Sequence, residues 1–274
     1  MLYTKFRPSD EPFPFEPRLV DLTLKLLNQF SAVAHSDITV LDVGCGFGRL
    51  VEALRDSGIN AYGCDISADW SDTNHFCKLI NPAPYKLPFE SNRFDVVITN
   101  SIWEHVHDHV LLYNEIKRCL NPGGCAIHIF PGRWYFMPGR FLLPVEPHIR
   151  VPFMHWLWPR PHLHKPPFFW FLISAYLGFK SPYQQYKTPK QIAESNLTYS
   201  MTQLNYLPHR THKQLSYAIF GNCSYPLDFF YTHTYGFAAK LYRLLPIKPI
   251  ISKILMHTRH SLMIQRKSVR YDQK

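Results

Sequence analysis

The chain has 274 residues and a mass of 32.2 kDa, with 46% hydrophobic residues, 18% charged residues and a formal net charge of +10. This composition is typical of a folded protein with one sizeable core and is a poor fit for membrane channels, fibres and mini-proteins. The longest near-continuous apolar run, 168–179, is shorter than the ~20 residues of a spanning helix, so no transmembrane helix is expected. Residues 1–17 lack the apolar region of a secretory signal, and the expected compartment is the cytosol.

The predicted elements alternate between helices and strands as far as residue 130. Apolar residues recur at helical spacing over 18–30, 47–54 and 109–120, whereas 38–43, 59–64, 94–99 and 124–130 are short apolar runs typical of buried strands. This alternation favours an α/β fold with a Rossmann-like, doubly wound and mostly parallel sheet.

Beyond Pro131 the periodicity is lost. Thr188 to Gln191 form a capping box that predicts a helix to about residue 196, 241–245 and 250–257 are short helical candidates, and 261–267 predicts a strand at the sheet edge. We therefore expect a cofactor-binding core in 1–130, an inserted aromatic and basic acceptor-binding region in 131–257, and a final edge strand and tail in 258–274.

Charge divides the chain in the same way. Residues 1–130 contain 11 Lys and Arg against 16 Asp and Glu, whereas residues 131–274 contain 19 against 4. The second half is expected to face an acidic or amphipathic partner.

A glycine cluster follows the strand at 38–43 and opens the next helix. Gly44, Gly46 and Gly48 allow the backbone to turn sharply and to approach a ligand closely, and Asp65, at the end of the next strand, can accept hydrogen bonds from both hydroxyls of a ribose. The spacing G-x-G-x-G differs from the dinucleotide fingerprint G-x-G-x-x-G and sets up no clear pyrophosphate site. A nucleoside without phosphates fits this pattern better.

At these residues the chain resembles the class I S-adenosylmethionine-dependent methyltransferases, in particular the small-molecule group called methyltransferase type 11. The resemblance covers roughly residues 20–130. It rests on V-L-D-V-G-C-G-F-G at 40–48, C-D-I-S at 64–67, L-P-F-E-S-N-R-F-D-V-V at 87–97, N-S-I-W-E-H-V at 100–106 and L-N-P-G-G at 120–124.

The resemblance implies S-adenosyl-L-methionine as the cofactor and assigns it a set of binding residues. The glycine loop, with Cys45 inside it and Asp42 supporting it, would surround the methionine end, Asp65 would hold the ribose and Ile66 would press on the adenine. Asn100 and Ser101 would lie beside the sulfonium. One departure is Asn81 and its neighbours, where many relatives have an acidic residue for the adenine amino group.

Methyl transfer is an in-line displacement, so catalysis is largely positioning. An oxygen or nitrogen acceptor also needs a general base. The candidates are His105, after the fourth strand, and His148, where the acceptor region begins, whereas His128 is expected to be structural.

No metal site is expected. The six cysteines include no C-x-x-C pair, and although His105, His107 and His109 lie close to Glu104 and Asp108, with 105 and 109 expected on one helical face, the resemblance is to a metal-independent group.

The predicted acceptor is a small, lipid-like or sugar-linked molecule, and peripheral contact with an anionic membrane fits the basic and aromatic second half. Two alternatives remain open at this point: a methyltransferase acting on RNA or protein, and a non-catalytic cofactor-binding partner subunit. DNA is a poor candidate, because the chain contains neither N-P-P-Y nor a Pro-Cys pair.

Overall fold

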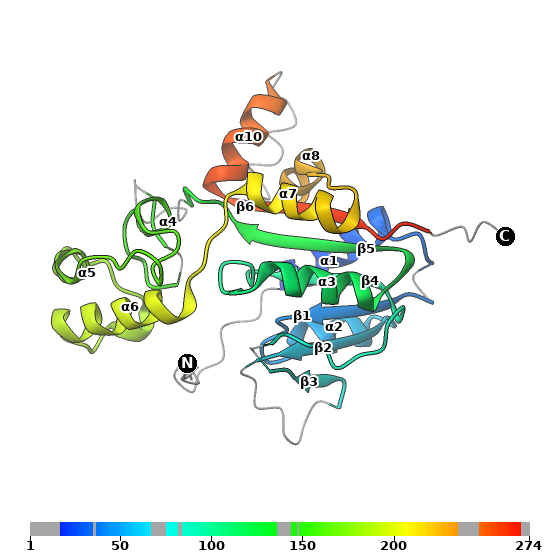
Figure 1. Cartoon of the computed structure of the whole chain (residues 1–274), viewed down its shortest axis with the longest axis horizontal. Helices are drawn as coiled ribbons and strands as arrows, with labels where there is room; N and C mark the ends of the chain where they lie inside the picture. The colour runs from blue at the N-terminus through cyan, green and yellow to red at the C-terminus, as the bar shows by residue number, and fades with distance from the viewer. Residues whose placement is uncertain are drawn as a thin grey trace.

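In the computed structural model six strands form one sheet with helices on both faces, and a lobe of helices extends from one end (Figure 1). The structure describes residues 17–34, 37–66, 75–81, 84–135, 144–146, 148–234 and 247–269. The strands are β1 (Thr39–Val43), β2 (Asn60–Asp65), β3 (Cys77–Leu79), β4 (Phe94–Asn100), β5 (Leu120–Pro131) and β6 (His260–Arg266). The helices are α1 (Pro17–Phe30), α2 (Arg49–Asp56), α3 (His109–Cys119), α4 (Met154–Leu157), α5 (Phe168–Tyr176), α6 (Pro189–Gln203), α7 (His209–Phe220), α8 (Leu227–Thr234) and α10 (Lys248–Thr258), with a 3-10 turn, η1 (Pro182–Gln184).

The sheet has the strand order β3-β2-β1-β4-β5-β6, in which only β6 is antiparallel to its neighbour. The predicted doubly wound, mostly parallel fold is therefore confirmed. The chain runs outward in opposite directions from β1 and β4. Ligands of open α/β sheets bind at such a switch point, beyond the carboxyl ends of the strands.

Each face of the sheet is covered by its own helices. On one face α1, α2 and α8 bury Leu26, Leu54 and Phe230 against the strands. On the other face α3 and α7 contribute Tyr113 and Phe220 to a second apolar cluster. Because both faces are covered, the strands are buried on both sides, which explains their near-continuous apolar sequences.

A chain of hydrogen bonds crosses the α3 side of the sheet and includes His128. The indole of Trp103 donates to Thr99 Oγ1 at 2.9 Å, and Thr99 Oγ1 lies 2.8 Å from His128 Nδ1. His128 Nε2 lies 3.1 Å from the Gln265 amide oxygen. Since that oxygen only accepts, Nε2 carries the proton and Nδ1 accepts from Thr99. Burial lowers the pKa of His128 to about 4, so this histidine is a neutral core residue that links β4, β5 and β6.

The region after β5 divides in space. Helices α4, α5 and α6 form the lobe at the left of Figure 1, whose small core includes Met154, Phe171 and Ala193, while α7, α8 and α10 return to the sheet. The capping box at Thr188 is present, but α6 continues to Gln203, well beyond the expected residue 196. Strand β3 and helices α7 and α8 were not predicted, and the candidate helix at 241–245 lies outside the described residues. The division of the chain into three parts stays a prediction. None of the described helices is both long enough and apolar enough to cross a bilayer.

Candidate active site

The glycine loop after β1 has a backbone that only glycine adopts readily. Gly44, Gly46 and Gly48 have φ angles of 80°, 52° and 75°, all in the left-handed region. The Gly44 N–H donates to the Cys64 carbonyl at the end of β2 (2.7 Å), and the Gly48 N–H donates to the Cys45 carbonyl (2.9 Å). The loop is therefore a tight turn fixed to the neighbouring strand.

The two sides of this loop differ. A Cβ atom on Gly44 would lie 2.2 Å from Cγ2 of Ile102, in the segment that follows β4, whereas a Cβ atom on Gly46 would meet nothing within 4 Å. The loop thus packs tightly against the β4 side and faces open space at Gly46, where a ligand can approach its backbone.

Two acidic residues lie at the ends of the strands beside the loop. Asp65 Oδ2, at the end of β2, accepts the Gly46 N–H at 2.9 Å. A carboxylate has about four acceptor positions, so this bond is compatible with further bonds to ribose hydroxyls. Asp42, at the end of β1, is buried, and this burial, with the nearby charge of Asp65, raises its pKa to about 7.

The end of β4 lies beside the loop, because Val43 of β1 pairs with Thr99 of β4. Ser101 follows with φ 54°, a rare conformation for a non-glycine residue that often marks a functional site. Its N–H donates to the Ile129 carbonyl at 2.8 Å, and its hydroxyl lies 3.4 Å from Asn100 Oδ1. The structure therefore brings Asn100 and Ser101 to the same sheet edge as the glycine loop.

The other two residues of the predicted cofactor set lie at the sides of this edge. Cys45 is buried, with its Sγ 3.9 Å from that of Cys77, and all six cysteines are free. Ile66, directly after Asp65, is half-buried against the α3-side core.

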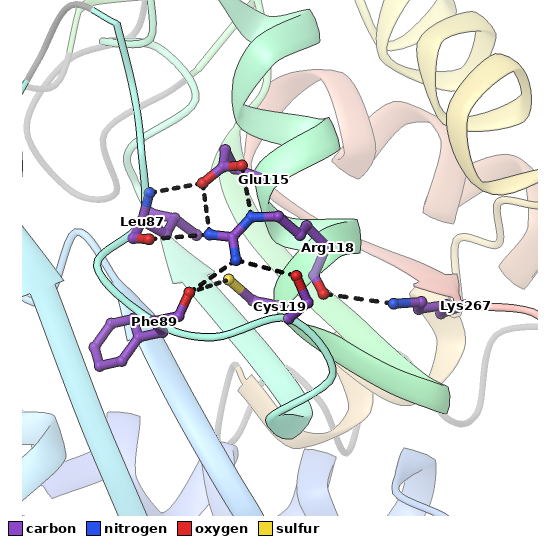
Figure 2. Close-up of polar contacts among 7 residues, drawn as sticks. Leu87, Phe89, Glu115, Arg118, Cys119 and Lys267 are labelled. Atoms are coloured by element: carbon purple, nitrogen blue, oxygen red, sulfur yellow. Dashed lines mark hydrogen bonds and ion pairs between the residues drawn. The ribbon is translucent and has the colours of Figure 1, made fainter.

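The L-P-F stretch is fixed by a guanidinium clamp (Figure 2). Arg118 of α3 donates to the Leu87 carbonyl (3.0 Å) and the Phe89 carbonyl (2.8 Å), and both oxygens of Glu115 accept from the same guanidinium (2.7 and 2.8 Å). Glu115 in turn accepts the Leu87 N–H (2.8 Å). Because Arg118 binds Glu115, the pKa of this carboxyl is lowered. The segment that leads from β3 to β4 is thus anchored to α3.

His105 and His148 meet, although 43 positions separate them. Their ring centroids are 4.9 Å apart, and Nε2 of His148 lies 3.6 Å from Oε1 of Glu104. His105 lies in the segment between β4 and α3, so the expectation that it shares a helical face with His109 is wrong. His107 and His109 point elsewhere, to the backbone carbonyls of Thr202 and Trp103.

Two buried carboxylates govern the electrostatics of this histidine pair. Burial alone would lower the pKa of His148, but Glu146 and Glu104 outweigh it and raise that pKa. Burial lowers the pKa of His105. Despite burial, the charges of His148 and His155 hold the pKa of Glu146 down at about 2. Sequence analysis missed Glu146, although it is one of only four acidic residues after residue 130.

A hollow of about 520 Å³ lies along one face of α6. Two of its lining residues also contact the histidine pair: the Gln203 carbonyl lies 2.8 Å from His105 Nδ1, and the ring centroid of Tyr199 is 6.3 Å from that of His105 and 6.2 Å from that of His148. Each of its lining side chains carries a polar group, although most of the lining surface is apolar: Lys187, Gln191, Glu194, Ser195, Thr198, Tyr199, Thr202 and Gln203.

Three comparisons show what the chain is similar to. A model of the methyltransferase domain family matches residues 41–128. A ubiquinone biosynthesis O-methyltransferase of Hydrogenovibrio crunogenus is 28% identical over 113 residues, 38% of this chain and 46% of that protein. Phosphoethanolamine N-methyltransferase 2 of Caenorhabditis elegans is 26% identical over 127 residues, 42% of this chain and 28% of that protein. A solved S-adenosylmethionine dependent methyltransferase from Mesorhizobium loti has 14% identity and a TM-score of 0.47, covering 90% of this chain and all of that one. The chain spans less than half the length of the two sequence relatives.

Proposed function

Because residues 41–128 form a methyltransferase domain of the S-adenosylmethionine-dependent class, we propose that the protein transfers a methyl group from S-adenosylmethionine to a small amphiphilic acceptor, lipid-like or sugar-linked. The family match confirms the family and the cofactor expected from the sequence. The observation that carries the proposal is the glycine loop at the switch point, open at Gly46 and bonded there to Asp65.

The residues fit a binding and positioning role. A bound cofactor would supply an electrophilic methyl group with its sulfur as the leaving group, and the surrounding residues would hold the acceptor atom in line with the methyl–sulfur bond. Asp65 would hold the ribose, the backbone of Gly44 to Gly48 would follow the methionine end, and Asn100 and Ser101 would line the place where transfer occurs. Cys45, Ile66 and Asp42 would complete the wall. A general-base role stays a prediction for His105 and His148.

The acceptor class follows from the surface around α6. The polar groups around the hollow suit a head group with hydroxyl, amine or sugar groups, and α5, which packs on α6, exposes apolar side chains on the same lobe. An acceptor with a polar head and an apolar tail matches both surfaces. The relative named for ubiquinone biosynthesis supports an acceptor of this kind, and the relative named for phosphoethanolamine supports only the polar head.

Calorimetric titration with S-adenosylmethionine and its demethylated product tests the cofactor site. We expect micromolar binding of both ligands to the wild-type protein. Asp65→Ala is expected to weaken binding about 100-fold or more, because hydrogen bonds to a charged acceptor contribute about 1.5–3 kcal/mol each.

The matched control is Asp56→Ala, which removes an exposed carboxylate at the end of α2 and should leave binding unchanged. Asp65→Asn keeps one acceptor oxygen, so its affinity for the cofactor should lie between those of Asp65→Ala and Asp56→Ala. If Asp65→Ala binds both ligands as the wild type does, the loop is not the cofactor site and the proposed function fails.

The amphiphilic acceptor leads to a proposal about where the protein works: the lobe rests on an anionic membrane. In and just after α5, Phe169, Tyr176 and Leu177 are 58%, 73% and 70% exposed. Residues 148–203 carry six Lys and Arg against one acidic residue, Glu194. Apolar side chains beside unbalanced positive charge are the combination that binds anionic lipid surfaces.

Co-sedimentation with vesicles tests this contact. We expect binding to vesicles containing phosphatidylserine and much weaker binding to pure phosphatidylcholine. The double variant Phe169→Ser/Leu177→Ser should reduce binding roughly tenfold or more, because burying each side chain contributes about 1.5–3 kcal/mol. Val110→Ser, which changes a half-exposed apolar residue of α3, is the control. Equal binding of both vesicle types would contradict the proposal, and salt-sensitive retention by RNA without vesicle binding would favour the RNA alternative.

A further inference from the structure

A cluster of side chains with metal-binding chemistry lies where the lobe meets the sheet. Glu104 and His105 come from the segment after β4, and His148 comes from the segment before α4. One potential ligand atom from each of these residues lies within 4.8 Å of the others. From the sequence, His107 and His109 were the candidate partners of His105, but in the structure His148 is the histidine that lies beside His105 and Glu104.

Glu104 is the strongest indication that something is bound here. The residue is 2% exposed, and neither of its carboxylate oxygens has a hydrogen-bond partner among the described residues. The nearest polar contact is His148 Nε2 at 3.6 Å, which itself has no hydrogen-bond partner there. Burying a polar atom without a hydrogen-bond partner is costly. A cation bound between Glu104 and His148 would remove this cost for both carboxylate oxygens and for His148 Nε2.

The orientation of His105 fits a ligand. Its Nδ1 lies 2.8 Å from the Gln203 carbonyl, and a carbonyl only accepts, so Nδ1 carries the proton. The lone pair is therefore on Nε2. Metal-binding histidines are held in this way, with the second ring nitrogen donating to a backbone carbonyl or a carboxylate.

The surrounding charge favours a divalent cation. Glu146 is fully buried close to His148, with Oε2 accepting the Ile149 N–H at 2.6 Å and Oε1 3.8 Å from His155 Nε2. A histidine that binds a metal ion through its lone pair is neutral, so in the metal-binding form the two buried carboxylates would leave the cluster with an excess of negative charge. A dipositive ion balances this charge, whereas a monovalent ion does not.

We propose that Glu104, His105 and His148 bind one divalent transition-metal ion, with zinc as the best match. Two imidazoles and one carboxylate suit zinc or ferrous iron, and they do not suit magnesium or calcium, which take mostly oxygen ligands. Three protein ligands leave a coordination position open. Tyr199 and Gln203 line the hollow along α6 and contact the two histidines, so an acceptor oxygen is the expected occupant of this position, a role that rests on the proposed function. In this arrangement the two histidines hold the ion and do not serve as the general base, since a lone pair bound to metal accepts no proton.

The test is a zinc titration of the 274-residue protein, measured by calorimetry, after bound metal has been removed with a chelator. We expect one zinc ion per chain. Glu104→Gln, which keeps the shape of the side chain, and His148→Ala should each weaken binding about 100-fold or more. Glu146→Gln should weaken it about tenfold, as for a residue outside the ligand set. His164→Gln, in an exposed part of the lobe, is the matched control. Cobalt loading gives a second readout, because its visible absorption should be lost in His148→Ala.

Thermal melts of each metal-free variant show whether it folds. The absence of zinc binding to the folded wild-type protein would overturn the proposal. Zinc binding that survives both Glu104→Gln and His148→Ala would also overturn it, since the ion would then bind elsewhere. Titration with S-adenosylmethionine tests the proposed function separately. Zinc binding without cofactor binding would contradict the proposed function and support the metal site. Cofactor binding without zinc binding would support the function and contradict the metal site.

Discussion

A Gly44→Ala variant is expected to lose measurable cofactor binding and about 2–5 kcal/mol of folding stability. Two costs add at this position. The left-handed φ of 80° costs a non-glycine residue about 1–2 kcal/mol, and a methyl group 2.2 Å from Ile102 Cγ2 forces the loop and the β4 segment apart, which costs about 1–3 kcal/mol. Denaturant unfolding measures the loss of stability, and calorimetric titration measures the loss of cofactor binding.

Two other glycines separate these costs. Gly58→Ala has a similar φ of 83° and open space around its Cβ, but it lies after α2, so only the conformational cost should appear and cofactor binding should remain. Gly46→Ala should also fold with a small loss, yet its methyl group would occupy the open side of the loop and block the cofactor. Cofactor binding by Gly46→Ala at wild-type affinity would show that the open side is not the binding site.

The stability of the protein is expected to fall steeply between pH 6 and pH 4. Burial lowers the pKa of His109 and His128 from 6.5 to about 4 and that of His209 to about 3. In this window the unfolded chain binds protons that the native protein does not, so each histidine removes up to about 1.4 kcal/mol of stability per pH unit of acidification. Asp42, with its pKa raised to about 7, acts in the opposite direction. These four groups alone give a net slope of up to about 3 kcal/mol per pH unit.

Urea unfolding at a series of pH values measures this slope. His128→Gln removes one of the titrating groups and should reduce the slope by about 1.4 kcal/mol per pH unit, a change separate from its effect on stability at pH 7. His164→Gln, which changes an exposed histidine, should leave the slope unchanged. A flat profile between pH 6 and pH 4 would mean that the buried histidines are already protonated in the native protein.

The sequence predicted the parts of the molecule whose pattern is local. Apart from β3, the strands and helices to residue 131 are recognisable because their apolar periodicity covers whole elements, and β6 could be predicted from 261–267 for the same reason. The glycine loop was predictable because positive φ angles require glycine at 44, 46 and 48. Asp65 could be predicted because it ends the next strand.

The rest depends on contacts that no local pattern records. Glu104, His105 and His148 come together only because the lobe folds back onto the segment after β4, where the Asn205 N–H donates to the Glu104 carbonyl (2.7 Å). The length of α6 and the existence of α7 and α8 were missed because packing, rather than periodicity, determines them. Glu146 had one indication in the sequence, its rarity as an acid in a strongly basic half.

The antiparallel strand β6 has a consequence for how the chain folds. Its partners on β5 are 129 to 141 positions away, from Pro131 with His260 to Cys125 with Arg266, yet Leu262, Met263 and Gln265 are fully buried. Pairing across such a distance is entropically expensive and slow. Until it occurs, β5 presents an unpaired edge to other chains. The interval before β6 docks is therefore when the refolding protein is most prone to aggregation, and adding denatured protein at low concentration should raise the refolding yield.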